Sequence, residues 1–147
     1  MTKRLLVIED GSEYVEFAQL FLADHFEVRV ARSAAEALRE LASPGADALL
    51  LDLRFDRAPA DVLVGDIDAT ARRLFGGDRA RALRYLQDQQ GALILGELRA
   101  AGYHQPAVFV HDFPSRRIDN LRKLYGAVDA VASFDAAAIR QALTRIE

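Results

Sequence analysis

The sequence contains no cysteine among its 147 residues. Disulfide bonds, thiolate metal sites and thiol nucleophiles are therefore excluded. Long apolar runs are also missing: none approaches the roughly 18 residues of a membrane span, and the run after Arg4 is too short for the core of a signal peptide. We therefore expect a cytoplasmic protein with no contact to a membrane.

An excess of positive charge is absent as well, since the formal net charge is -3. The sequence thus gives no electrostatic reason to expect binding to nucleic acid. It has no glycine-rich nucleotide-phosphate motif and no serine and histidine arrangement typical of a hydrolytic triad. With 51% hydrophobic and 28% charged residues, the composition is that of an ordinary globular chain. We expect a single domain over residues 1–147.

Apolar runs suited to buried strands alternate with segments of helical periodicity. This alternation is typical of an α/β fold, a doubly wound parallel sheet with helices on both faces. Ser12 and Ser33 are expected N-caps, because each is followed by an acidic residue three or four positions on. Five strands are predicted, at residues 4–8, 27–31, 48–52, 107–110 and 128–132.

Acidic residues close two of these apolar runs. Glu9 and Asp10 follow the first run, and Asp52 follows the third. The carboxyl ends of parallel strands meet at one edge of a sheet, where open α/β sheets bind ligands. Converging carboxylates repel one another and commonly share a hard divalent cation, here Mg²⁺. Such acids can also be turn or cap residues, but Asp52 follows a buried strand, where a carboxylate without partners is costly.

The alternation is interrupted between residues 55 and 88. Gly76 and Gly77 are typical of a helix end, and Asp78 is positioned to cap a new helix that runs towards Gly102. Seven arginines and five aspartates between Arg54 and Arg84 favour a solvated face over a binding patch. A long excursion after a candidate active-site residue is nevertheless where lids and docking elements occur.

Several stretches carry a resemblance to a known family. They are LVIED at 6–10, LLLDL at 49–53, GALILGELRAAG at 91–102, PAVFV at 106–110 and GAVDAV at 126–131. In order and approximate spacing, this set resembles a bacterial response-regulator receiver domain (CheY-like). The resemblance implies a flavodoxin-like five-stranded parallel sheet with strand order 2-1-3-4-5, in a single receiver-like domain with an insertion at about residues 55–88.

The resemblance also implies a site. By position, Glu9, Asp10 and Asp52 would bind Mg²⁺, with the backbone carbonyl of Arg54 as a further ligand. Asp52 would accept a phosphoryl group, so the chain would be no enzyme beyond self-phosphorylation from a phosphodonor. The implied partners are a histidine kinase or phosphotransfer protein and a downstream protein target, with a homodimer possible. Because the sequence ends at Glu147, after the last expected helix, we expect the signal to leave through protein contact.

The sequence departs from the family at the phosphoryl-site neighbours. His111 stands where the family has threonine or serine, and Ser133, followed by Phe134, stands where it has lysine. Ala130 replaces the aromatic switch residue. His111 would be a hydrogen-bond donor or a proton-sensitive switch, or else a strand-end side chain bonded to Asp112. The loss of the lysine removes a cation that normally pairs with the phosphoryl group.

A further departure concerns spacing. The family has roughly eight residues between its phosphoacceptor and the glycine of the third helix, and here Gly91 follows Asp52 by 39 positions, which leaves about thirty extra residues. One hypothesis is that Arg54 or Arg57 lies over the acidic edge and replaces the lysine, since a guanidinium suits phosphoryl oxygens. The alternative is that Arg54 pairs with a local aspartate.

Two other functions remain open. One is a phosphorylation-independent pseudo-receiver that acts as an interaction module. The other is a Mg²⁺-dependent phosphohydrolase or nuclease. Dehalogenase-type phosphatases need an aspartate two positions after the nucleophile, where this chain has Arg54. Topoisomerase-primase-type sites join a strand-end glutamate to an Asp-x-Asp pair, and Glu9 with Asp52 satisfies only part of that pattern.

Overall fold

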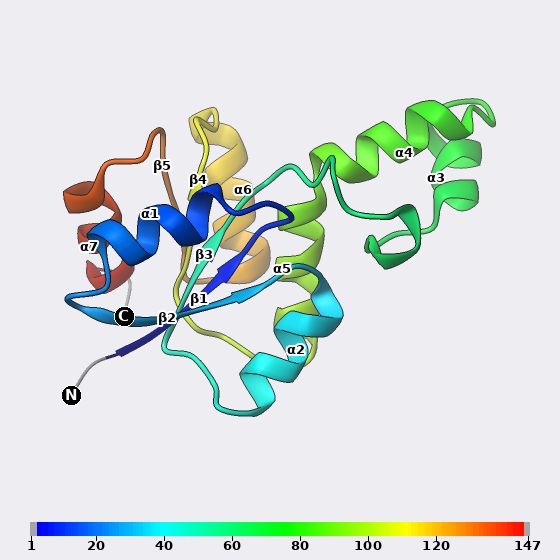
Figure 1. Cartoon of the computed structure of the whole chain (residues 1–147). Coiled ribbons are helices and arrows are strands. Elements are labelled where there is room, and N and C mark those ends of the chain that lie inside the picture. Colours follow the sequence, from blue (N-terminus) through cyan, green and yellow to red (C-terminus); the bar gives the residue numbers. More distant parts are fainter. Residues whose placement is uncertain (1–2, 146–147) are drawn as a thin grey trace.

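The computed structural model describes residues 3–145, so the expected domain limits at residues 1 and 147 lie outside the described part. Its centre is a five-stranded, wholly parallel sheet with strand order β2-β1-β3-β4-β5 (Figure 1). The strands are β1 (Lys3–Ile8), β2 (Phe26–Ala31), β3 (Ala48–Leu51), β4 (Ala107–Val110) and β5 (Val128–Val131). The predicted sheet and strand order are confirmed. β3 ends one residue earlier than predicted, which places Asp52 just beyond the strand.

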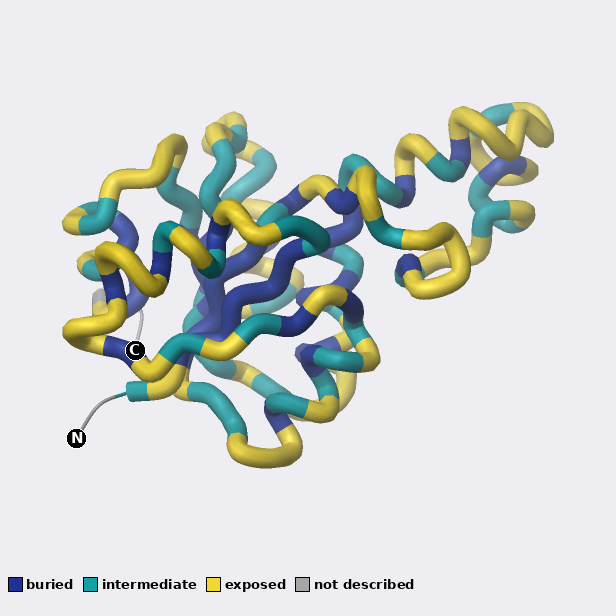
Figure 2. Tube along the Cα trace, in the orientation of Figure 1, coloured by how far each residue is buried: buried dark blue, intermediate teal, exposed yellow. Residues whose placement is uncertain are grey.

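Helices cover both faces of the sheet, because successive strand residues point to opposite sides. Leu5, Val7 and Leu50 pack in one core cluster with residues of α1 (Glu13–Phe21) and α7 (Ala136–Arg145). Leu6 and Leu49 pack in the other cluster with residues of α2 (Ala34–Ala42), α5 (Gln90–Ala100) and α6 (Ser115–Tyr125). The central strands are accordingly buried (Figure 2). The remaining helices are α3 (Ile67–Leu74) and α4 (Arg79–Asp88), and a 3-10 turn spans Ala60–Val62.

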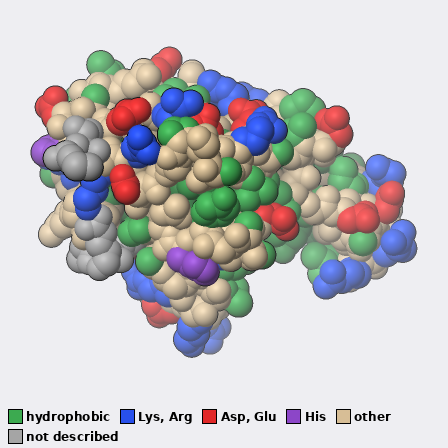
Figure 3. Space-filling model, turned by 90° about the horizontal axis from the view of Figure 1, so that it is seen from below, with side chains coloured by type: hydrophobic (Ala, Val, Ile, Leu, Met, Phe, Trp, Pro, Cys, Tyr) green, Lys and Arg blue, Asp and Glu red, His purple; other side chains and the backbone are tan. Residues whose placement is uncertain are grey.

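Between β3 and α5 the chain forms a projection, which we call the arm and define as residues 60–88. Its helices α3 and α4 lie side by side and extend away from the sheet (Figure 1). Asp66 caps α3 by accepting the amide of Ala69 at 3.0 Å, and Asp78 caps α4 by accepting the amide of Arg81 at 3.2 Å. The cap predicted at Asp78 is therefore confirmed. Arginine side chains are mixed with aspartates over the arm (Figure 3), as expected for a solvated face.

The helix predicted to run from Asp78 towards Gly102 is interrupted at Gln89, where α4 ends and α5 begins at Gln90. The buried Gln90 side chain accepts the amide of Val64 at 2.7 Å and donates to the Val64 carbonyl at 3.2 Å, which fastens the root of the arm to α5. Within residues 3–145, no helix combines the length and the apolar character needed to cross a membrane.

Candidate functional site

Asp52 lies at the carboxyl edge of the sheet, where its amide donates to the carbonyl of Ile8 at 3.0 Å and so continues the β1–β3 pairing. Asp52 lines a surface hollow of about 280 Å³. The hollow is lined by Asp10, Glu13, Tyr14, Asp52, Arg54, Asp56, Arg57 and Phe134. Two of the three predicted carboxylates, Asp10 and Asp52, thus face the same space, together with the predicted neighbour Arg54.

Glu9, the third predicted carboxylate, is turned towards α1. It is completely buried, and its two carboxylate oxygens accept the amides of Tyr14 at 3.0 Å and Val15 at 2.7 Å. These bonds satisfy N–H groups in the first turn of α1, which is the task of a cap. Ser12 occupies the N-cap position of α1, as predicted, but its side chain makes no cap bond, whereas the Ser33 side chain caps α2 by accepting the Glu36 amide.

The buried position also affects the protonation of Glu9. Burial raises its pKa, and the two amide hydrogen bonds act against that rise. Over residues 3–145, no group of three His, Cys, Asp or Glu side chains has an arrangement that would hold a metal ion. Metal binding by Glu9, Asp10 and Asp52 therefore stays a prediction. Glu9 would have to bind the ion with carboxylate oxygens that already accept amides of α1.

The Asp52 carboxyl group has little to compensate for its burial. Desolvation raises its pKa from 3.8 to about 7, and the charges of Asp10 and Glu9 add to the rise. The Arg54 amide nitrogen, 3.3 Å from Oδ1, acts in the opposite direction by donating to the carboxylate. An ionised Asp52 is thus held in a site that favours an additional positive charge beside it.

Asp10 supplies the second carboxylate of the hollow, and its Oδ2 accepts the amide of Arg57 at 2.6 Å. Oxygen ligands from two carboxylates, completed by water, are what Mg²⁺ prefers, and a divalent cation would offset the unfavourable burial of Asp52. The donor set of Asp10 and Asp52 therefore fits the predicted ion, although binding itself stays a prediction.

The two candidate arginines differ in their partners. The Arg57 guanidinium binds Glu13, with Nη2 2.7 Å from Oε1, and this bond lowers the pKa of Glu13 to about 2. No ion pair within residues 3–145 involves Arg54, so the predicted pairing of Arg54 with a local aspartate is not observed. Arg54 is therefore the cation of the hollow that remains available to an anionic group.

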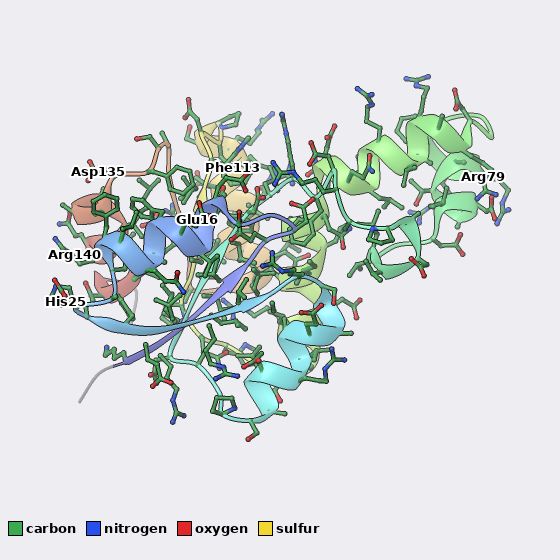
Figure 4. The ribbon with its side chains drawn as sticks, in the orientation of Figure 1. Glu16, His25, Arg79, Phe113, Asp135 and Arg140 are labelled. Atoms are coloured by element: carbon green, nitrogen blue, oxygen red, sulfur yellow. The ribbon has the colours of Figure 1, made fainter. Side chains whose placement is uncertain are left out.

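His111 lies close enough to Arg54 for the charge of Arg54 to affect the protonation of its ring. Burial lowers the pKa of His111, and the charge of Arg54 lowers it further. Its ring packs against Phe113, labelled in Figure 4, with centroids 4.7 Å apart. Among the described residues, no hydrogen bond joins the His111 side chain to Asp112. The neutral ring is thus favoured at physiological pH, which gives it one donor and one acceptor nitrogen.

Ser133 is exposed and does not line the hollow, whereas Phe134 does. The Phe134 ring packs on Tyr14 and on Phe17, each with a centroid distance of 4.9 Å. The Tyr14 hydroxyl in turn donates to the carbonyl of Val110 at 3.0 Å. The sequence did not lead us to predict that Tyr14 lines the hollow. The available signal was its position in the first turn of the helix that follows the acidic pair.

No protein-family model matches the sequence, and the search of curated proteins gave no match. Solved structures do match it over nearly the whole chain. A two-component response regulator from Clostridium difficile has a TM-score of 0.65 at 13% identity, with 99% of this chain and 95% of that chain covered. A response regulator receiver domain protein from Clostridium thermocellum has a TM-score of 0.64 at 17% identity, covering 98% and 93%.

The chemotaxis protein CheY4 of Vibrio cholerae has a TM-score of 0.66 at 15% identity, and the match covers 100% of both chains. At such low identity, these similarities establish the fold and not the activity. All three matches cover at least 98% of this chain, so they include the parallel sheet of order 2-1-3-4-5. The chain therefore has the fold of a CheY-like response-regulator receiver domain.

Proposed function

We propose that the protein is an atypical receiver that relays a signal through protein contacts, with Asp52 as its phosphoacceptor. A histidine kinase or a phosphotransfer protein would donate the phosphoryl group. The observation that carries this proposal is the hollow at the carboxyl edge, which Asp52 shares with Asp10 and with the unpaired Arg54.

In the proposed reaction, a carboxylate oxygen of Asp52 attacks the phosphorus of the donor. An O–P bond forms as the bond from phosphorus to the leaving group breaks, and the leaving group departs with the electron pair. Such transfer depends mainly on positioning and on neutralising the charge spread over the phosphoryl oxygens. Asp10 and Asp52 would hold Mg²⁺, which supplies part of that neutralisation.

Arg54 would supply the remaining positive charge in place of the lysine that the sequence lacks. A planar guanidinium offers two parallel N–H donors to phosphoryl oxygens. Arg57 is less suited to this role, because its guanidinium already binds Glu13. His111 would assist by donating a hydrogen bond to the phosphoryl group from its neutral ring.

Acetyl phosphate labelling tests the proposal directly. The protein is incubated with Mg²⁺ and acetyl phosphate, and its intact mass is compared with those of Asp52→Asn and Asp112→Asn. Asp112 is a matched control, because it is an exposed carboxylate after a neighbouring strand and does not line the hollow. A phosphoryl adduct on the native chain and on Asp112→Asn, but not on Asp52→Asn, supports the proposal. Beryllofluoride binding provides a second readout of the same site.

A second candidate, a phosphorylation-independent interaction module, is favoured by the position of Phe134 in the hollow and by the exposure of Ser133. Absence of both the adduct and the beryllofluoride complex would support this candidate. Turnover of a generic phosphomonoester with Mg²⁺ or Mn²⁺ would instead support the phosphohydrolase alternative.

A further inference from the structure

A shallow trough runs between α4, α5 and α6, on the side of the molecule from which the arm projects. Its inner part is a hollow of about 290 Å³, and its outer part on the arm is a hollow of about 250 Å³. Tyr85 lines both parts, so the two hollows adjoin at this residue. The inner part is lined by Tyr85, Gln89, Ala92, Leu93, Arg117, Asn120, Leu121, Leu124 and Tyr125, and the outer part by Phe75, Arg81, Arg84, Tyr85 and Asp88.

Large apolar side chains are unusually accessible in this trough. Leu124 is 70% exposed and Tyr85 is 40% exposed, and partly buried Leu93 lies beside them. Isolated exposed apolar residues need no explanation, but several that line one concave surface are typical of an interaction site. The apolar floor is thus suited to the nonpolar face of a partner.

Side-chain hydrogen bonds and close packing fix the positions of the helices that form the trough. Arg117 on α6 donates from Nη2 to the Gln89 side chain at 2.6 Å, at the junction of α4 and α5. Arg99 on α5 donates from Nε to the carbonyl of Tyr125 at 2.8 Å. A Cβ placed on Gly96 would lie 3.0 Å from the Tyr125 hydroxyl, so α5 and α6 approach closely there. The groove is therefore formed before any partner binds.

Positive charge predominates along the rim. Three arginines line the trough, and Asp88 is the single carboxylate among its lining residues. The Arg81 guanidinium lies 5.0 Å from the ring centroid of Phe75, and Arg117 binds the neutral Gln89. No ion pair in residues 3–145 involves Arg81, Arg84 or Arg117. These charges are therefore complementary to an acidic partner.

We propose that this trough binds an acidic amphipathic helix of a partner protein. A helix presents apolar residues at positions i, i+3, i+4 and i+7 on one face, which suits an elongated groove with an apolar floor. Glutamate or aspartate residues beside that face would pair with Arg81, Arg84 and Arg117. The proposal does not depend on phosphorylation of Asp52, so the two can fail separately.

Panning of a phage-displayed library of helical peptides against the full chain tests the proposal. The enriched peptides are expected to be amphipathic and acidic, with fluorescence anisotropy giving their affinities. Leu124→Asp and Arg84→Glu are each expected to weaken binding about tenfold or more. Both residues are exposed, so neither change disturbs the core.

Two control variants separate the trough from the rest of the surface. Arg79→Glu changes an arginine at the outer end of the arm (Figure 4), where it pairs with Asp68 outside the trough. Leu20→Asp changes an apolar residue of α1 that is 75% exposed. Both should bind the selected peptides as the native chain does. Failure to enrich peptides, enrichment of basic peptides, or unchanged binding by Leu124→Asp would overturn the proposal.

The other possible occupant is a second copy of the chain, through the exposed apolar residues and acids of α1. Sedimentation of the native chain over a range of concentrations distinguishes this case. The proposal expects a monomer. A contact between α1 and the trough would be head-to-tail, because the two surfaces differ, and would give rings or filaments and not a two-fold dimer. Self-association that is lost in both Leu20→Asp and Leu124→Asp would overturn the proposal of a separate partner.

Discussion

Replacement of Asp52 by asparagine should stabilise the protein at alkaline pH. The carboxyl group is largely buried beside two other acids, and burial raises its pKa from 3.8 to about 7. The folded protein therefore retains a proton on Asp52 at pH values where the unfolded chain has released it. Because the unfolded state binds fewer protons in this interval, the free energy of unfolding falls as the pH rises from about 4 to about 7. Asparagine has nearly the same shape and never ionises.

The magnitude follows from the same pKa. Each step of one in pKa corresponds to about 1.4 kcal/mol, so the full rise sets a ceiling of about 4 kcal/mol. The hollow is open to solvent, which screens the charge, and we expect about 2–3 kcal/mol after this reduction. The free energy of unfolding of Asp52→Asn should therefore equal that of the native chain near pH ~4 and exceed it by about 2–3 kcal/mol near pH ~8.

Urea unfolding of both proteins at the two pH values measures the difference. Mg²⁺ should narrow the gap at the higher pH, since an ion that binds only the folded native site stabilises it by mass action. Asp56→Asn is the matched control: Asp56 lines the same hollow but is exposed, and its replacement should change stability by about 0.5 kcal/mol or less. A difference between the native chain and Asp52→Asn that is the same at both pH values would refute the reasoning.

Three further outcomes are expected. Glu9→Ala should lower the free energy of unfolding by about 1–2 kcal/mol in urea titrations, because α1 loses both cap bonds, whereas Ser12→Ala should have almost no effect. Gly91→Ala should cost about 1–3 kcal/mol in the same assay, since its Cβ would lie 2.1 Å from the Asp52 carbonyl oxygen. Arg54→Ala should slow acetyl phosphate labelling by about tenfold or more in a mass time course, and an unchanged rate would exclude Arg54 as the substitute cation.

The sequence was sufficient for the sheet because the three central strands, β1, β3 and β4, contain short, nearly continuous apolar runs, which are typical of buried parallel strands. The parts that it did not predict depend on contacts between distant residues. Glu9 has the same local pattern as a metal-binding carboxylate, and its use as the cap of α1 follows from how the chain turns after β1. The interruption between α4 and α5 at Gln89 could not be predicted either, because helical periodicity continues across it. The hydrogen bonds of Gln90 to Val64 form only when the arm is folded.

The loop that follows Asp52 connects the carboxyl edge to the helices that form the trough. The Arg57 amide binds Asp10, the Phe55 amide donates to the Gln87 carbonyl of α4 at 2.9 Å, and the Gly91 amide donates to the Leu53 carbonyl at 2.8 Å. A group that draws the Asp10 carboxylate away from the Arg57 amide would therefore act on residues 53–57, a short segment of backbone that is hydrogen-bonded to α4 and α5. Packed elements of this kind shift as units and do not deform gradually. The proposed chemistry at Asp52 and the proposed binding at the trough thus share one piece of backbone, which would give one a physical route to influence the other.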